Sequence, residues 1–126
     1  MPFALWSILL AALLPLIWAG VAKAGSRVDN HRPREAMAQV GGYRQRANWA
    51  QQNAWEAFPT YAAAVLVGWV MQVPPAFLNL AAAVFIAARI AHGLLYLADQ
   101  ASLRSLSWLI GLLTVVAIFC KAGGLF

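Results

Sequence analysis

"FALWSILLAALLPLIWAGVA", residues 3–22, carries no charged side chain. Its length matches the roughly 20 apolar residues that a helix needs to cross a hydrocarbon core about 30 Å thick. A cleaved signal peptide is the alternative, but no basic residue precedes the run, and the charges follow it. Pro15 is compatible with a membrane helix, because neighbouring helices can satisfy the backbone groups that a proline frees. We therefore interpret the run as a retained membrane span.

The composition of the whole chain supports this interpretation. Of 126 residues, 63% are hydrophobic and only 10% are charged, against roughly 25% charged in ordinary soluble domains. A soluble protein of this size could not bury so much apolar surface. The single cysteine, Cys120, excludes an internal disulfide, and its apolar neighbours favour a small core residue over a nucleophile.

Three further segments have the length of membrane helices. The apolar run 57–73 follows a stretch of good helix formers, which predicts one long helix that ends at the proline pair after Val73. No internal repeat appears. The sequence thus predicts an all-α membrane protein, one domain over 1–126, folded as a bundle of four transmembrane helices. The expected spans are about 3–22, 44–72, 76–97 and 104–122.

A basic loop over 23–43 joins the first two spans. The net charge of the chain is +5, and six of its nine lysines and arginines crowd this loop and the start of the next helix. Cytoplasmic loops of membrane proteins carry such an excess, so we expect the loop in the cytoplasm and both termini outside. Nucleic-acid binding is not expected, because no aromatic platform or binding module accompanies the charge.

Three polar side chains stand inside the apolar segment 76–97, namely Arg89, His92 and Tyr96. An arginine at the centre of a bilayer costs about 2.5–3.5 kcal/mol on insertion scales, so such residues normally face the bundle interior and mark a ligand site or pathway. At about 100° per residue, the three side chains fall within about 60° of one another on a helix. They form one polar stripe.

A second polar stripe runs along the helix expected over 44–72. Arg46, Asn53 and Glu56 lie within about 80° of one another on the helical wheel. Glu56 is the one acid of this stripe, and Arg89 is the one base deep in the third span, so they are candidates for an interhelical ion pair. Such a pair would either fix the helix register or contact a ligand.

Each polar residue also has a structural interpretation. Asn53 suits a hydrogen bond that holds two membrane helices together. Tyr96 suits an interfacial anchor, and His92 suits a histidine that is satisfied within the bundle. Arg104 opens the last span on the cytoplasmic side, where it can extend to the lipid headgroups. Two stripes that open toward one side of the membrane nevertheless favour a shared ligand site.

The residue types indicate the chemistry of that ligand. Arginine grips carboxylates through paired donors, so the site suits a polar ligand with several carboxylates. No metal site is expected, because His31 and His92 are far apart and no second histidine or cysteine stands at ligand spacing.

The two stripes resemble the signature of a known family. The segment "RANWAQQNAWEAFP" at 46–59 and the segment "RIAHGLLYL" at 89–97 are similar to motifs of the membrane-associated proteins in eicosanoid and glutathione metabolism, the MAPEG family. The pair "RS" at 104–105 resembles the start of that family's fourth helix. The resemblance extends to the length of the chain, its four expected spans and its basic first loop. Trp49 and Gln52 depart from it, since well-characterised eicosanoid-pathway members carry more arginines in this motif.

The resemblance implies a homotrimer that binds glutathione between neighbouring subunits, in the inner membrane of a bacterium. It implies that Arg104 is the catalytic residue, which stabilises the thiolate of glutathione, and that Ser105 assists it. A lipophilic electrophile would enter from the bilayer and be conjugated, or a peroxide would be reduced. By motif match, the glutathione-binding residues would be Arg46, Asn53, Glu56, Arg89, His92 and Tyr96.

Two other functions are compatible with the residues. In the first, the chain is a non-catalytic binding or scaffold protein of MAPEG type, and its stripes only fix helix packing. In the second, it is a small transporter or channel subunit, which would need polar residues through the full depth of the membrane. The outer half of each expected span is nearly all apolar, which disfavours the second function.

Overall fold

The computed structural model of the chain describes residues 1–27 and 29–126. Within these residues the protein is all-helical. The helices run close to the ranges expected from the sequence, and one short helix is added in the loop. They are α1 (Phe3–Lys23), α2 (Pro33–Ala38), α3 (Gly42–Val70), α4 (Pro75–Leu97) and α5 (Ala101–Ala122).

Three of the helices are long and apolar enough to cross a membrane: α1, α4 and α5. With 23 residues, α4 is the longest of the three, and a helix of that length extends about 35 Å. The longest helix of the chain, α3, has 29 residues but is less apolar, because it carries Arg44, Arg46 and Glu56.

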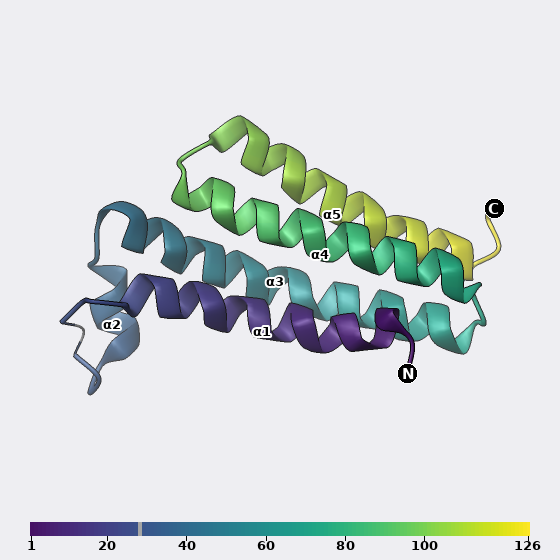
Figure 1. Cartoon of the computed structure of the whole chain (residues 1–126), viewed down its shortest axis with the longest axis horizontal. Coiled ribbons are helices and arrows are strands. Elements are labelled where there is room, and N and C mark those ends of the chain that lie inside the picture. Colours follow the sequence, from purple (N-terminus) through teal and green to yellow (C-terminus); the bar gives the residue numbers. More distant parts are fainter. Residues whose placement is uncertain (28) are drawn as a thin grey trace.

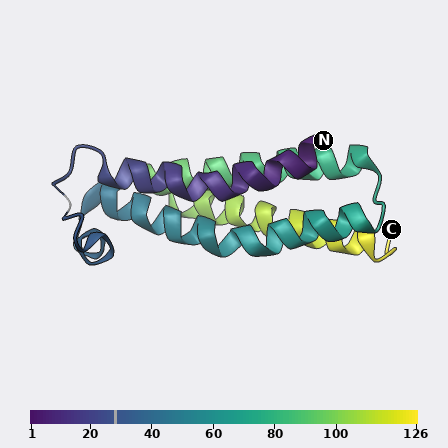
Figure 2. The ribbon, with the colours of Figure 1, turned by 90° about the horizontal axis from the view of Figure 1, so that it is seen from below.

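The four long helices lie side by side, with both termini at one end and α2 at the other (Figures 1 and 2). Helix α1 packs on α3 and α4, and α5 packs on the same two helices from its own side. The pair α3 and α4 is therefore the centre of the molecule. Both of these helices carry a predicted polar stripe, so the arrangement puts the two stripes in the interior pair.

Two tight turns reverse the chain at the ends of α3 and α4. After α3, Gln72 has φ of 59° and the Val73 N–H donates to the Gly68 carbonyl. After α4, Asp99 has φ of 56° and the Gln100 N–H donates to the Leu95 carbonyl. Each is a left-handed cap that satisfies a free helix carbonyl. The first cap ends α3 at Val70, two residues before the expected end at 72, so the chain turns before it reaches the prolines.

The loop expected over 23–43 contains the short helix α2. Pro33 occupies its first turn, where the missing N–H costs nothing. Its one buried side chain, Met37, packs with Ala22 of α1 and Ala47 of α3. Arg44 also holds this end together, because its Nη1 donates to the carbonyl oxygens of Ala22 at 3.2 Å and Ala24 at 2.6 Å, which end α1.

A close contact between α1 and α4 depends on a glycine. Trp18 of α1 is buried at 5% exposed area and lies against Gly93 of α4. A carbon atom added at Gly93 would overlap the Trp18 ring. The absence of a side chain at Gly93 thus sets how closely α1 approaches α4.

A polar group deep in the apolar half of the bundle is also satisfied. The Tyr61 hydroxyl of α3 is hydrogen-bonded to the Ser7 hydroxyl of α1, and Ser7 in turn donates to the Ala4 carbonyl at 2.6 Å. The Tyr61 ring stacks on Phe85 of α4 with centroids 3.7 Å apart. These contacts fix both aromatic rings, and one of them, Phe85, forms part of the site described next.

Replacing Gly93 with alanine should lower the stability of the protein, because the added methyl group overlaps Trp18 and overpacking costs about 1–3 kcal/mol. The matched control is Gly20→Ala in α1, where the rest of the chain offers no atom within 4 Å of the added carbon. That variant should be unchanged or slightly stabilised, since alanine has the higher helix propensity. Thermal unfolding in detergent, followed by circular dichroism, compares the two. Equal melting temperatures would contradict the Trp18–Gly93 contact.

Candidate functional site

Residues of the two stripes meet across the antiparallel pair α3 and α4. Arg89 Nη2 donates to Asn53 Oδ1 at 2.6 Å. Seven residues earlier on α3, Arg46 donates from Nε and Nη2 to the Leu97 carbonyl at 3.3 and 3.2 Å. The stripe geometry expected from the helical wheel therefore brings Asn53 and Arg89 together, and it turns Arg46 toward the last carbonyl of α4.

Arg89 is the most deeply placed charge of the site. Its side chain is only 4% exposed, and it lies eight residues before Leu97, which is about 12 Å along a helix. A guanidinium carries five N–H donors, so the bond to Asn53 leaves donors for other partners. A charged donor that keeps free N–H groups beside a cavity is suited to bind an anionic group.

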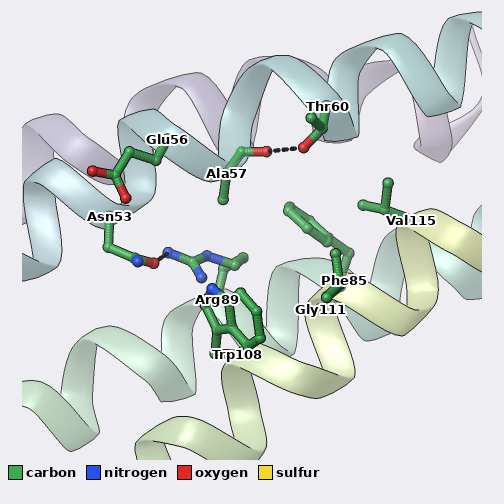
Figure 3. Close-up of a pocket in the computed structure, with 10 residues that line it drawn as sticks. Asn53, Glu56, Ala57, Thr60, Phe85, Arg89, Trp108, Gly111 and Val115 are labelled. Carbon is green, nitrogen blue, oxygen red and sulfur yellow. Dashed lines mark hydrogen bonds between the residues drawn. The ribbon is translucent and has the colours of Figure 1, made fainter.

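The ion pair expected between Glu56 and Arg89 does not form. Among the described residues, the one salt bridge within 4.0 Å joins Arg32 and Glu35, outside the bundle. Figure 3 shows the Arg89 guanidinium directed at Asn53, with the Glu56 carboxylate on the same side of the cavity but not bonded to it. Glu56 follows Asn53 by three residues, which is a rotation of about 300° around the helix, or about 60° short of a full turn. The two side chains therefore point in different directions, and that of Glu56 is exposed.

A second group of expected residues gathers around the Tyr96 ring, nearer to the end that carries α2. The Arg104 guanidinium of α5 lies over this ring at 4.3 Å from its centroid. The His92 ring meets it edge-on at 5.2 Å, and the Trp49 ring is 6.4 Å away. A cation over an aromatic face is attracted by the ring's quadrupole, so Tyr96 holds Arg104 in place.

His92 lies between Arg89 and Tyr96 along α4 and is 3% exposed. Its Nδ1 is buried and has no hydrogen-bond partner among the described residues. A buried polar atom without a partner costs about 1–3 kcal/mol. Within the described residues this cost stays uncompensated at His92.

A cavity of about 220 Å³ lies between α3, α4 and α5. One wall is polar and contains Asn53, Glu56 and Arg89, and the other wall is mostly apolar and aromatic (Figure 3). Arg46, His92, Tyr96 and Arg104 are not among the residues that line it. The remaining lining residues are Ala57, Thr60, Phe85, Trp108, Gly111, Leu112 and Val115.

The apolar wall was not anticipated from the sequence, although one signal for part of it exists. On α5, Trp108, Gly111 and Val115 follow Arg104 at intervals of four, three and four residues, which is the spacing of one helix face. Phe85 likewise stands four residues before Arg89 on α4. Aligning the apolar residues with the polar ones would have indicated that both line the same space.

The arrangement can hold a polar ligand with both charge signs beside an apolar one. Arg89 and Arg104 are cations of α4 and α5, and Glu56 is an exposed carboxylate on α3. Within the described part of the chain, no three His, Cys, Asp or Glu side chains lie close enough to hold a metal ion. The chemistry that the side chains themselves offer is anion binding and stabilisation of a developing negative charge.

Comparison with known proteins identifies the family. No curated protein and no solved structure matches the chain. The model of the MAPEG family matches residues 3–124, which includes both stripes, the cavity and all four long helices. The chain is thus an integral membrane protein of the MAPEG family, a family that includes glutathione transferases and related proteins.

Proposed function

We propose that the protein is a glutathione-dependent transferase or peroxidase that acts on lipophilic electrophiles within the membrane. The observation that carries this proposal is the shared cavity wall of Asn53, Glu56 and Arg89, with Arg104 one helical turn from the cavity residue Trp108. The wall offers groups for a charged peptide, and the rest of the cavity offers an apolar surface. Membership of the MAPEG family supports the same conclusion.

The side chains fit the charged groups of glutathione, which has two carboxylates and one ammonium. Arg89 keeps free donors for a carboxylate, and the exposed Glu56 carboxylate is able to accept an ammonium group. His92 is included in the proposed site because it belongs to the stripe of Arg89 and Tyr96. Arg46 uses Nε and Nη2 on Leu97 and keeps Nη1 for a ligand. Tyr96 would contribute through its hydroxyl.

Glutathione supplies a thiol whose ionised form is the nucleophile. A cation next to the sulfur favours the ionised form. Arg104 is such a cation, and it lies on the same face of α5 as the cavity residues, toward the proposed cytoplasmic end. Tyr96 holds its guanidinium through the cation–π contact. Arg104 is thus the proposed catalytic residue. A lipophilic electrophile would reach it from the bilayer, along the apolar wall.

The proposal includes an architecture of four membrane spans and a homotrimer. In it, α3 crosses the membrane as the fourth span, and the basic end with α2 faces the cytoplasm, in the inner membrane of a bacterium. The outward face of α3 carries Gln52, and Glu56 stands between this face and the cavity; both side chains are exposed in the single chain. Because a carboxylate that faces lipid is costly, a neighbouring copy is needed to cover this face.

One observation favours the alternative of a non-catalytic scaffold. The hydrogen bonds of Arg46 to Leu97 and of Arg89 to Asn53 already connect α3 to α4. Both bonds would fix helix register without any ligand. The two functions differ in whether glutathione binds and in whether Arg104 affects its thiol, and each difference is measurable.

Glutathione should bind to the detergent-purified protein with a saturable heat in titration calorimetry. Arg89→Ala should weaken this binding by about tenfold or more, because a hydrogen bond to a charged group contributes about 1.5–3 kcal/mol. Arg89→Lys keeps the charge but loses the paired donors, so its affinity should fall in between. Arg32→Ala, which removes a surface charge at 74% exposure, is the control and should bind normally. No heat from folded wild type at millimolar glutathione would refute the transferase function.

Removing the cation of Arg104 should raise the pH at which the bound thiol ionises. The expected sign follows from charge: without the cation the thiolate is less favoured, so less of it exists at neutral pH. The thiolate absorbance of the glutathione complex, followed against pH, measures this for wild type, Arg104→Ala and Arg104→Lys. Lysine should restore part of the shift, and Arg32→Ala should show none. Superimposable curves for wild type and Arg104→Ala would leave Arg104 without a role in thiol activation.

The outward face of α3 should be buried in a homotrimer. Native mass spectrometry of the protein released from detergent should give the mass of three chains. Gln52→Glu places a second carboxylate four residues from Glu56 on this face, and like charges at that spacing repel, so it should shift the spectrum toward monomer. Gln39→Glu, in the exposed turn after α2, is the matched control. A monomeric wild type, or a trimer that Gln52→Glu leaves unchanged, would count against this interface.

A further inference from the structure

Another cleft lies at the basic end of the bundle, between α2 and the first half of α3 (Figure 1). It measures about 530 Å³ and shares no lining residue with the cavity beside Arg89. Met37 fixes the α2 wall, because its side chain is buried against Ala22 of α1 and Ala47 of α3. The cleft is therefore formed by the packing of the chain itself.

Both charged residues that line this cleft are basic. Lys23 ends α1 and Arg34 stands on α2, and no acidic residue is among the described residues of the lining. The one salt bridge of the described chain joins two other residues, so neither cation is paired with a carboxylate there. The nearby Arg44 instead donates to backbone carbonyl oxygens at the end of α1. Lys23 and Arg34 are thus available to an anion.

A buried amide also lines the cleft. Asn48 of α3 is 9% exposed. Gln45 lines the cleft as well, three residues earlier and on the same side of the helix. Side-chain amides carry N–H donors, and phosphate oxygens accept such bonds. The lining therefore combines positive charge with neutral donors, which suits a phosphate group.

The cleft lies at the level where two membrane spans end. Lys23 is the last residue of the span α1. Arg46, between Gln45 and Asn48 on α3, donates to the carbonyl of Leu97, the last residue of the span α4. Residues at the ends of apolar spans lie among the lipid headgroups. An anion bound here is therefore at the depth of a phospholipid phosphate.

Two tryptophans continue the cleft away from its cations. Trp49 and Trp55 line it and are 43% and 44% exposed. Trp55 stands seven residues after Asn48, which is about 10 Å along the helix. Indole rings are enriched at the interface between headgroups and hydrocarbon. A free phosphate makes no use of this part of the cleft, whereas the glycerol and upper acyl chains of a lipid do.

We propose that this cleft binds an anionic phospholipid, with the phosphate at Lys23, Arg34 and Asn48 and the glycerol and upper acyl chains along Trp49 and Trp55. Basic pockets between helices at the membrane surface bind headgroups of this kind. The combination of two cations, a buried amide and two exposed indoles in one cleft is what carries the proposal.

This site is independent of the proposed glutathione chemistry, since none of its residues lines the cavity beside Arg89. Gln52 also lines the cleft, and it belongs to the face of α3 proposed for a neighbouring copy. The lipid therefore lies beside that copy. The number of chains and the number of bound lipids have to be measured together.

Native mass spectrometry of the detergent-purified protein measures both numbers. The protein is offered equal amounts of phosphatidylglycerol, which is anionic, and phosphatidylcholine, which is zwitterionic. Each basic residue near a membrane surface favours an anionic headgroup about fivefold, so wild type should prefer phosphatidylglycerol by at least about tenfold. The double variant Lys23→Gln with Arg34→Gln should lose the preference. Its matched control, Arg27→Gln with Arg32→Gln, removes two exposed cations outside the cleft and should keep it.

A further variant tests the cleft without removing a cation. Asn48→Asp places a carboxylate of nearly the same shape beside the phosphate, and retention of phosphatidylglycerol should fall at least about tenfold. Circular dichroism checks that each variant is folded, and the exposed double variants carry the test if Asn48→Asp is not.

Three outcomes would overturn the proposal. Wild type could retain the two lipids equally, which would leave the cleft without selectivity for an anion. Both double variants could lose the preference equally, which would reduce it to a general attraction to positive charge. Millimolar inorganic phosphate could displace the lipid completely, which would assign the cleft to a free anion. Retention of the lipid in phosphate is the expected result, because the chains add contacts that phosphate lacks.

Discussion

A charged guanidinium buried in an apolar helix bundle is the constraint on which the other features depend. Arg89 lies about 12 Å inside α4, and at that depth an arginine costs about 2.5–3.5 kcal/mol on insertion scales. Its hydrogen-bond partner must therefore come from a neighbouring helix, and Asn53 of α3 supplies it. Because this partner is a neutral amide, the cation remains available to an anion, which distinguishes the site from a closed structural ion pair.

The site changes from polar to apolar along the bundle axis. Arg46, Tyr96 and Arg104 stand near the basic end, Arg89 and Asn53 lie deeper, and Phe85 lies deeper still. The proposed reaction joins a water-soluble thiol to a membrane-dissolved electrophile, and these two substrates prefer opposite solvents. Their meeting point has to lie where one environment gives way to the other. The cavity beside Arg89 occupies that boundary.

Much of the fold could be predicted from the length and polarity of the chain. The apolar runs predicted where the long helices begin and end to within a few residues, because a helix needs a fixed number of residues to cross the membrane. The helix α2 was missed, since its six residues bury one side chain, Met37, and carry no lengthy apolar pattern. The end of α3 was misplaced by two residues because the left-handed turn at Gln72 leaves no marker in the sequence.

The polar half of the site was more predictable than the apolar half. A charged or amide side chain in an apolar helix is visible in the sequence, so a polar stripe could be predicted on each helix, although Glu56 and not Asn53 was the expected partner of Arg89. A helical wheel gives only angles, however, and it could not show that Arg89 bonds to Asn53 and not to Glu56. Phe85 and Gly111 stand among many apolar residues, most of which face away from the interior. Only the packing of three helices distinguishes them.

The two hydrogen bonds between α3 and α4 have a consequence for how the chain can vary. Arg46 and Asn53 are seven residues apart on α3, and their partners Leu97 and Arg89 are eight residues apart on α4. One residue gained or lost inside either stretch would rotate one contact by about 100° relative to the other. A change of side chain between these points leaves the two contacts in register, whereas an insertion or deletion there breaks one of them. Relatives that keep this site should therefore differ in composition along these stretches and never in their length.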